Sequence, residues 1–342
     1  MKKKFFTALK LIIFLAIGFF FIWIFVKDLT AEEKKQIFHS FSIANYWWLL
    51  LCFFIGLLSH VFRTIRWNML IHTIGYRPRF RNTFLSLMIG YFANLALPRL
   101  GEITRCGFLT KYEKIPFEKS FGTVIAERAL DMLTFIVLFF INLFIQYNTI
   151  SGYVKENITK PLTEKFQFFG KGYLLYAFIF CVIFLTIFLL IFHKRLLKYR
   201  IYQKIITVLK GFWEGLKSLG KVKTPFMFVV YTVLIWLMYY LMSYVCFFSL
   251  VETSDAGLGA VLSVLVMGTI GIMVVQGGIG IYPVIVAETL TIYGVKNITG
   301  FALGWLIWGA QTFIIILAGI VSLILLPILN NKNDEQVREN IE

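Results

Sequence analysis

The sequence predicts an all-α polytopic membrane protein with about six full spans and two re-entrant helical hairpins, arranged as an inverted repeat. Hydrophobic residues form 59% of the 342 residues, against about 45–50% in ordinary globular chains, and the mean hydropathy is +0.78. Apolar runs recur along the chain, and two of them are interrupted by glycine or proline. Lys and Arg gather in particular loops, so membrane topology explains the net charge of +16 better than a nucleic-acid partner does.

Six apolar runs are predicted to span the membrane, because a span needs about 20 predominantly apolar residues. The first run begins after Met1-Lys2-Lys3-Lys4 and lacks a small-residue cleavage site, so we expect it to stay in place as a signal anchor. The segment 30–45 after it is predicted to be a short polar loop. The six runs cover residues 11–26, 46–62, 120–145, 172–192, 225–250 and 301–327.

Two further apolar stretches are too short and too interrupted to span. The first has arms at 83–97 and 100–112, and the second has arms at 258–275 and 281–293. We expect each stretch to enter and leave the membrane on the same side. Non-helical backbone at membrane depth has to be covered by protein or by a water-filled cavity. The predicted tip residues are Asn94, Pro98, Gly101, Gly277, Gly278 and Gly280.

Positive charges distinguish this topology from one in which all eight runs span. With six spans and two hairpins, 25 Lys and Arg residues lie on one side and 8 on the other, whereas eight spans divide them 15 to 18. Cytoplasmic loops normally carry the excess of Lys and Arg. The hairpin topology therefore fits better. It places both termini and the basic, amphipathic stretch 194–223 in the cytoplasm.

The chain is expected to form one transmembrane domain over residues 1–330, with pseudo-repeat halves at about 1–150 and 170–330 and a polar, disordered tail at 331–342. Each half has the order span, span, hairpin, span, and the two halves have opposite orientations. In transporters built from inverted repeats, paired short segments interrupted by Gly or Pro indicate the substrate site. We therefore expect the two hairpin tips to meet near the midplane.

Six charged residues lie at or just after the first interrupted stretch. A charge at the bilayer centre costs about 2.5–3.5 kcal/mol on insertion scales, so charges found there usually serve a pathway or an ion pair. One hypothesis is a site for a lipid phosphate headgroup, since arginine binds phosphate bidentately and a broken helix offers free N–H groups. The other is that the charges neutralise one another and fix the hairpin. The residues are Arg99, Glu102, Arg105, Glu127, Arg128 and Asp131.

Two pairings are expected within this set. Arg128 can pair with Asp131, three residues later on the same helix. Glu127 can pair with Arg99 or Arg105 on another helix. Such pairs would form a structural lock, and direct contact with a substrate is the alternative.

Three more charged residues receive weaker interpretations. Glu288 is the only acid of the second hairpin, and it is a candidate substrate-binding residue of the cavity. Arg63 and Arg66 follow the second apolar run and are expected to snorkel to the cytoplasmic face. A vestibule that collects headgroups is the alternative for these two arginines.

No cofactor, metal or catalytic site is expected. The four histidines form no HxxxH or HExxH pair. The glycines at 277, 278 and 280 lack the preceding strand and the following Lys-Ser/Thr of a nucleotide-binding loop. The four cysteines have no CxxC spacing and lie mostly in apolar runs, which is typical of small buried side chains.

The same charged block carries a resemblance to a known family. Its residues are Asn94, Pro98, Arg99, Gly101, Glu102 and Arg105, followed by Glu127, Arg128 and Asp131, with Arg63, Arg66 and Trp67 upstream and Gly277, Gly278 and Gly280 downstream. This pattern resembles the lysylphosphatidylglycerol synthase transmembrane-region family, which is flippase-like and includes UPF0104-type membrane proteins. The family often has Pro before the paired glycines, where this sequence has Gln276. The aminoacyl-transferase domain of the lysyl-lipid synthases is not among these residues, so the resemblance implies lipid translocation and not lipid synthesis.

The sequence and the resemblance together imply an inner-membrane protein that moves a phosphate-bearing phospholipid or lipid-linked sugar between leaflets. No ATP-binding motif is visible, so a gradient or mass action would drive the movement. The expected partners are membrane lipids with phosphate-bearing headgroups, not nucleic acid, and a homo-oligomer is left open. One rival hypothesis is a membrane glycosyltransferase or lipid-modifying enzyme that acts on polyprenyl-phosphate-linked substrates through Glu102, Glu127 or Asp131. Another is an accessory subunit without catalysis.

Overall fold

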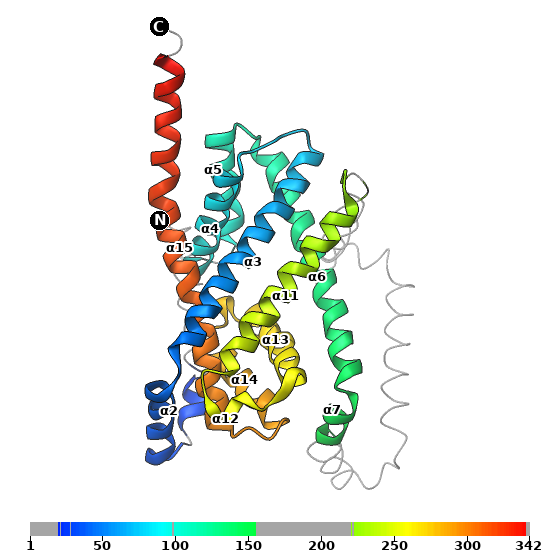
Figure 1. Ribbon diagram of the computed structural model, residues 1–342, viewed down its shortest axis with the longest axis vertical. Helices are drawn as coiled ribbons and strands as arrows, with labels where there is room; N and C mark the ends of the chain where they lie inside the picture. Colours follow the sequence, from blue (N-terminus) through cyan, green and yellow to red (C-terminus); the bar gives the residue numbers. More distant parts are fainter. Residues whose placement is uncertain are drawn as a thin grey trace, which may run out of the picture.

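A computed structural model describes residues 20–154 and 220–339, apart from Phe21, Asp28, Pro98 and Lys221. All regular elements in this part of the chain are helices, which confirms the predicted all-α class. Five of the helices are long and apolar enough to cross a membrane (Figure 1). They are α3 (Tyr46–Thr73), α6 (Phe117–Ile145), α11 (Pro225–Phe247), α13 (Gly257–Val274) and α15 (Asn297–Glu339).

Four of the six predicted spans fall within the described residues and are found there. The runs at 46–62, 120–145, 225–250 and 301–327 correspond to α3, α6, α11 and α15. The run at 11–26 lies mostly outside the described residues, and the run at 172–192 and nearly all of the stretch 194–223 lie outside them. The fifth long apolar helix, α13, was predicted as a hairpin arm.

Two polar segments are helical where the sequence was interpreted as loop or tail. Helix α2 (Ala31–Ile43) begins with a capping box, in which Thr30 Oγ1 accepts a hydrogen bond from the Glu33 N–H at 3.2 Å and the Glu33 carboxylate accepts one from the Thr30 N–H at 2.7 Å. This reciprocal pair satisfies helix-end donors, so the prediction of a loop at 30–45 was wrong. Helix α15 continues to Glu339, so the prediction of a disordered tail was wrong as far as that residue.

The first hairpin consists of α4 (Phe80–Ala96) and α5 (Leu100–Glu113), which pack against each other. The chain turns through Arg99, whose φ of 64° is left-handed. The Gly101 N–H donates to Asn94 Oδ1 at 2.7 Å, and a Cβ on Gly101 would lie 2.0 Å from the carbonyl oxygen of Gly90. The predicted tip residues Asn94 and Gly101 therefore close the hairpin: one supplies a hydrogen bond and the other lets two backbones touch.

The second hairpin consists of α13 and α14 (Ile281–Thr291), joined by a short 3-10 turn, η2 (Gln276–Gly278). Gly277, Gly278 and Gly280 have φ angles of 69°, 70° and 76°, a region that glycine occupies without the steric cost of a Cβ. The indole N–H of Trp308 on α15 donates to the Gly277 carbonyl at 2.7 Å. The predicted interruption therefore forms a turn that is held against α15.

The two hairpins lie at opposite ends of the helical bundle. In Figure 1 the α4–α5 hairpin extends from the upper end, where α3 finishes, and the α13–α14 hairpin extends from the lower end, beyond α11 and the short α12 (Val251–Ser254). Helix α4 contacts η2, so the two tips approach each other inside the bundle. Their re-entrant placement in a membrane and the two-fold relation of the halves remain predictions.

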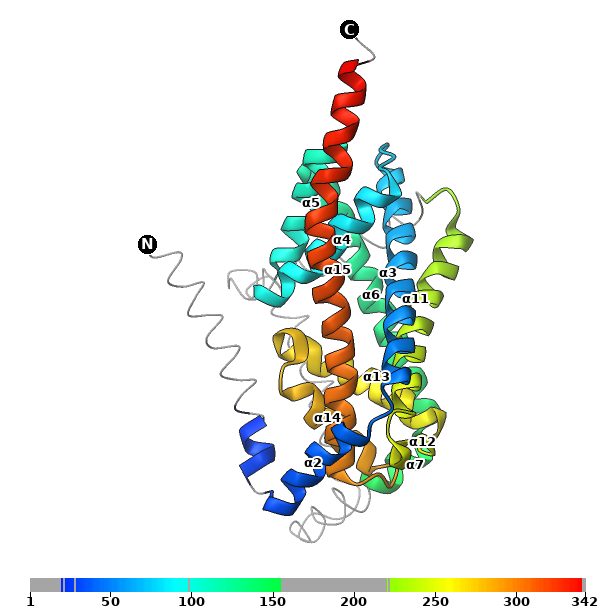
Figure 2. The same cartoon turned by 60° about the vertical axis from the view of Figure 1, so that its left-hand side comes forward.

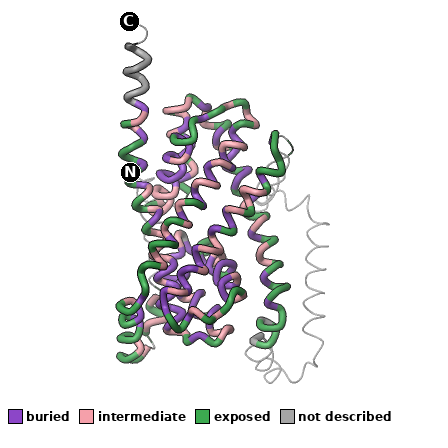
Figure 3. The backbone as a smooth tube through the Cα atoms, viewed as in Figure 1, coloured by how far each residue is buried: buried purple, intermediate pink, exposed green. Residues whose placement is uncertain are grey.

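Helix α15 packs closely against both hairpins, and Figure 2 shows it running alongside them. A Cβ on Gly304 would lie 2.6 Å from the Cα of Pro283 in α14, and a Cβ on Gly319 would lie 2.4 Å from the Cβ of Phe92 in α4. Buried residues are concentrated where the hairpins meet α3, α11 and α15, while the outer faces of α6 and α15 carry many exposed positions (Figure 3). Among the hairpin helices, α14 is the most enclosed, since most of its residues are buried.

Candidate functional site

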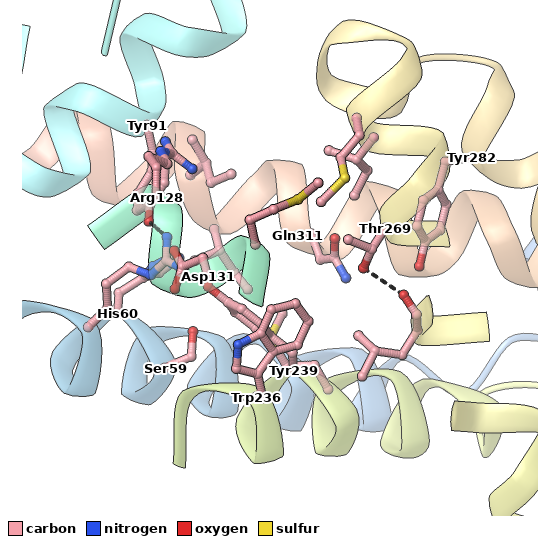
Figure 4. A pocket seen from close by; sticks show the side chains of 18 residues that line it. Ser59, His60, Tyr91, Arg128, Asp131, Trp236, Tyr239, Thr269, Tyr282 and Gln311 are labelled. Carbon is pink, nitrogen blue, oxygen red and sulfur yellow. Dashed lines mark hydrogen bonds and ion pairs between the residues drawn. The ribbon is translucent and has the colours of Figure 1, made fainter. Parts of the chain in front are cut away.

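A cavity of about 490 Å³ lies between the long helices, with contributions from both hairpins. One end is polar and is lined by Ser59, His60, Arg63, Tyr91, Arg128 and Asp131. Towards the other end the lining is mainly apolar, with Leu265, Ile272, Met273 and Ile314 among its residues, and Figure 4 shows the two ends in one view. The cavity therefore has one charged end and one apolar end.

Asp131 of α6 binds two arginines of α3 at once. Its Oδ2 accepts from Arg63 Nη2 at 2.6 Å, and its Oδ1 accepts from Arg66 Nη2 at 2.5 Å. Arg63 also donates to the Tyr91 hydroxyl from α4. The side chain of Arg66 has no exposed surface. Each carboxylate oxygen thus has its own guanidinium, and the pair of bonds joins α3 to α6.

Glu127, one turn before Asp131, joins the first hairpin to the same cluster. Its Oε2 accepts from Arg105 Nη2 of α5 at 2.8 Å, and its Oε1 lies 3.8 Å from Arg63 Nε and 3.7 Å from Arg66 Nη2. Glu127 is fully buried. The expected cross-helix pair between Glu127 and Arg105 is therefore present.

Arg128 has a partner other than the one expected. Its Nη2 donates to Glu102 Oε1 of α5 at 2.7 Å, whereas Asp131 binds the two arginines of α3. The Arg128 side chain is 44% exposed, and it lines the cavity. The predicted Arg128–Asp131 pair within α6 was wrong, because Asp131 bonds to α3 and Arg128 bonds to α5.

The described ion-pair cluster has one positive charge in excess. It contains four arginines against three carboxylates: Arg63, Arg66, Arg105 and Arg128 face Glu102, Glu127 and Asp131. Removing one partner of a buried ion pair leaves a buried charge uncompensated. The cluster therefore joins α3, α5 and α6, and three of its members, Arg63, Arg128 and Asp131, line the polar end of the cavity.

The model of the family described as the lysylphosphatidylglycerol synthase TM region matches residues 8–319. The chain belongs to this family. The match includes both hairpins and the residues of the ion-pair cluster. It confirms the family that the charged block resembles.

Two curated relatives carry names of the UPF0104 type. One, from Methanocaldococcus jannaschii, is 33% identical over 144 residues, which is 41% of this chain and 41% of the relative. The other, from Methanothermobacter thermautotrophicus, is 35% identical over 78 residues, which is 22% of this chain and 23% of the relative. The chain therefore covers less than half the length of each. No solved structure matches it significantly.

In this member of the lysylphosphatidylglycerol synthase TM region family, Arg63 and Arg66 lie inside the helix bundle and do not snorkel. Both residues are buried, because α3 continues for eleven residues beyond the predicted end of its apolar run, from 62 to Thr73. Trp67 follows them, and its indole N–H donates to Thr123 Oγ1 of α6 at 3.0 Å. The spacing of Arg63, Arg66 and Trp67 on one helix face was the signal that these arginines face protein.

Other predicted site residues lie apart from the cluster. Arg99 is exposed at the tip of the first hairpin, and it makes no ion pair with the described residues. Glu288 is exposed on α14, where its Oε1 accepts from Asn297 Nδ2 at 2.9 Å, and it is not among the residues that line the cavity. Pro98 lies outside the described residues. Asn94 and Gly101 lie next to Glu102 and Arg105 at the base of the cluster.

Nothing in the sequence indicated that several other residues would line the cavity. They are neutral polar or aromatic residues inside long apolar runs, where a single such residue is most often a core residue. The lining includes Ser59, His60, Tyr91, Trp236, Tyr239, Tyr282 and Gln311. Only their convergence from five different helices makes them a site.

Proposed function

We propose that the protein moves a lipid with an anionic headgroup between the leaflets of a bacterial-type inner membrane. The observation that carries the proposal is the excess positive charge of the ion-pair cluster at one end of a cavity whose other end is apolar. A phosphate group is the natural partner of such a cluster, because arginine donors match its oxygens in pairs.

The cavity also offers a route for the acyl chains. Four of its lining residues are exposed: Arg128 and Met132 on α6, and Ile272 and Met273 on α13. A headgroup in the polar end could therefore leave its tails in the surrounding lipid, between α6 and α13. This arrangement lets the charged part cross inside the protein while the apolar part remains in hydrocarbon.

In this proposal the hairpins are the elements that move. They reach the cavity from opposite ends of the bundle, and their tips are in contact. If each hairpin faces a different side of the membrane, displacement of one would open the cavity to one leaflet while the other keeps it closed. Inverted repeats in transporters work in this way around a fixed site. The positive-inside distribution would place both termini in the cytoplasm.

The contacts of the carboxylates favour translocation over the enzyme hypothesis. A general acid or base has to reach the proton that it transfers. Here Glu102, Glu127 and Asp131 each bind at least one arginine. A carboxylate that is already bonded to a guanidinium is less available for proton transfer, so these contacts suit an electrostatic role better.

The test is a leaflet-exchange assay. The purified protein is reconstituted into vesicles with NBD-labelled phosphatidylglycerol, and dithionite reduces only the label in the outer leaflet. We expect the wild type to expose the inner-leaflet label faster than protein-free vesicles do. Replacing Arg128 with glutamine removes a charge-assisted hydrogen bond worth about 1.5–3 kcal/mol, so exchange should fall about tenfold or more.

The matched control is Arg79→Gln, which removes an exposed arginine at the start of α4 and should leave exchange unchanged. If the wild type and empty vesicles lose the label alike, or if Arg128→Gln exchanges lipid like the wild type in equally folded protein, the proposal is wrong.

A further inference from the structure

We infer that the cavity has a second, uncharged subsite, formed by Tyr282 and Gln311, which takes a hydroxyl-bearing part of the lipid headgroup. The inference rests on the proposed function and adds the class of substrate. Figure 4 shows the two regions together: the charged residues on one side, Tyr282 and Thr269 on the other, and Gln311 between them. The lipid would be a phosphate ester whose headgroup continues into a polyol or a sugar.

Tyr282 is the first observation. Its residue is only 2% exposed, yet its hydroxyl makes no hydrogen bond with the described residues, and in Figure 4 this hydroxyl points into the cavity. The hydroxyl oxygen is not among the fully buried side-chain atoms that lack a partner in the described chain, so it keeps accessible surface in the cavity. A hydroxyl of this kind is therefore available to a ligand, as both donor and acceptor.

The ring that carries this hydroxyl packs closely against the backbone of α13. A Cβ on Gly268 would lie 2.5 Å from the Tyr282 ring, and a Cβ on Gly278 would lie 3.2 Å from the Tyr282 Cβ. Gly268 therefore lets the backbone of α13 approach the ring, and Gly278 lets η2 approach the Cβ of the same tyrosine. This close packing restricts the ring on the side of α13, and restricting a group before a ligand arrives lowers the entropy cost of binding.

Gln311 of α15 is the second observation. It lines the same cavity, and its amide forms no hydrogen bond within the described part of the chain. An amide offers a carbonyl acceptor and an NH₂ donor. Thr269 adds one more acceptor, because its hydroxyl gives its hydrogen to the Leu265 carbonyl at 2.6 Å and keeps its oxygen lone pairs.

The chemistry of this subsite defines its ligand. Its groups are neutral, and the nearby lining is apolar, with Leu265, Ile272 and Ile314. A quaternary ammonium group offers no hydrogen bonds to these residues. Hydroxyl groups match them, because a hydroxyl both donates and accepts. The cavity volume of about 490 Å³ falls in the common range of roughly 300–1,000 Å³ for small-molecule sites.

The test compares headgroups that share the phosphate and differ beyond it. Binding to the purified protein in detergent is measured by native mass spectrometry with phosphatidylglycerol, phosphatidylinositol and phosphatidic acid as probes. We expect the two hydroxyl-bearing lipids to bind the wild type about tenfold more tightly than phosphatidic acid, as one well-placed hydrogen bond allows. Tyr282→Phe and Gln311→Leu should each remove most of this preference and leave phosphatidic acid binding unchanged.

The control is Tyr240→Phe, which removes a hydroxyl that donates to the Leu258 carbonyl at 3.1 Å, away from the cavity. It should keep the full preference. Both Tyr→Phe changes keep the ring, and thermal unfolding of each variant checks the fold.

The possible outcomes separate the two proposals. Equal binding of all three lipids to the wild type would overturn the subsite and leave the proposed function standing. Preference retained in both Tyr282→Phe and Gln311→Leu would also overturn it. If none of the three lipids binds the wild type, the proposed function fails and the subsite fails with it.

Discussion

Glu127 and Asp131 lie one turn apart on α6, and both reach the same two arginines of α3. Asp131 is bonded to Arg63 and Arg66 at 2.6 and 2.5 Å, and Glu127 Oε1 lies 3.8 and 3.7 Å from them. The two carboxylates thus divide their contacts, since Asp131 holds α3 and Glu127 bonds mainly to Arg105 of α5. This arrangement makes α6 the helix on which the charged lock depends.

Replacing Glu127 with glutamine should destabilise the protein strongly. The change leaves Arg105 buried without its anionic partner, which typically costs about 3–5 kcal/mol. The free energy of unfolding in mixed micelles measures the effect. Glu118→Gln is the control on the same helix, since Glu118 is exposed, and surface changes usually stay within about 0.5 kcal/mol. Equal stability of the two variants would contradict the lock.

Arg66 and Asp131 should be energetically coupled. In a double-mutant cycle with Arg66→Gln and Asp131→Asn, we expect the double variant to be more stable than the sum of the single effects, by about 0.5–3 kcal/mol. The reason is that the second change removes the charge that the first leaves unpaired. The same cycle with Arg79 in place of Arg66 should be additive, because Arg79 is exposed and distant from the cluster. Additivity for Arg66 itself would exclude the coupling.

Gly101→Ala should open the first hairpin. The new Cβ would lie 2.0 Å from the Gly90 carbonyl oxygen, so α4 and α5 have to separate, and overpacking typically costs about 1–3 kcal/mol. Gly107→Ala on the same helix meets nothing within 4 Å and should be neutral or slightly stabilising. Thermal unfolding of both variants tests the comparison. A Gly101→Ala protein as stable as the wild type would contradict the close packing of α4 against α5.

The topology prediction is tested by cysteine labelling of intact cells, in a background without the four native cysteines. Lys111→Cys lies in the last turn of α5, and Asp255→Cys lies beyond α12 at the opposite end of the bundle. A membrane-impermeant maleimide should label the second position from outside and the first only after lysis. Ready labelling of Lys111→Cys in intact cells would reverse the predicted orientation.

The two helix interruptions could be predicted because the residues at them favour a break in the helix. Three glycines with left-handed φ angles end the regular helix at the second tip, and Asn94 with Gly101 closes the first. The pair between Arg105 and Glu127 could also be predicted, because a buried charge is costly unless an opposite charge pairs with it. Local chemistry was sufficient for these features.

The partners of the remaining charges could not be predicted in the same way. Whether Arg63 and Arg66 face lipid headgroups or protein depends on how far α3 extends and where α6 lies beside it. Both depend on the tertiary structure, which local sequence does not specify. The neutral half of the cavity posed the same problem. A tyrosine such as Tyr282 in an apolar run looks like core until the helices around it are placed.

The long helix α15 has one more consequence, for the order in which the protein is assembled. Gly304 receives the second hairpin and Gly319 receives the first, so both hairpins rest on a helix near the end of the described chain. A ribosome completes this helix after both hairpins have been made. The first hairpin is therefore made well before α15, and in that interval its contacts are those with α3 and α6.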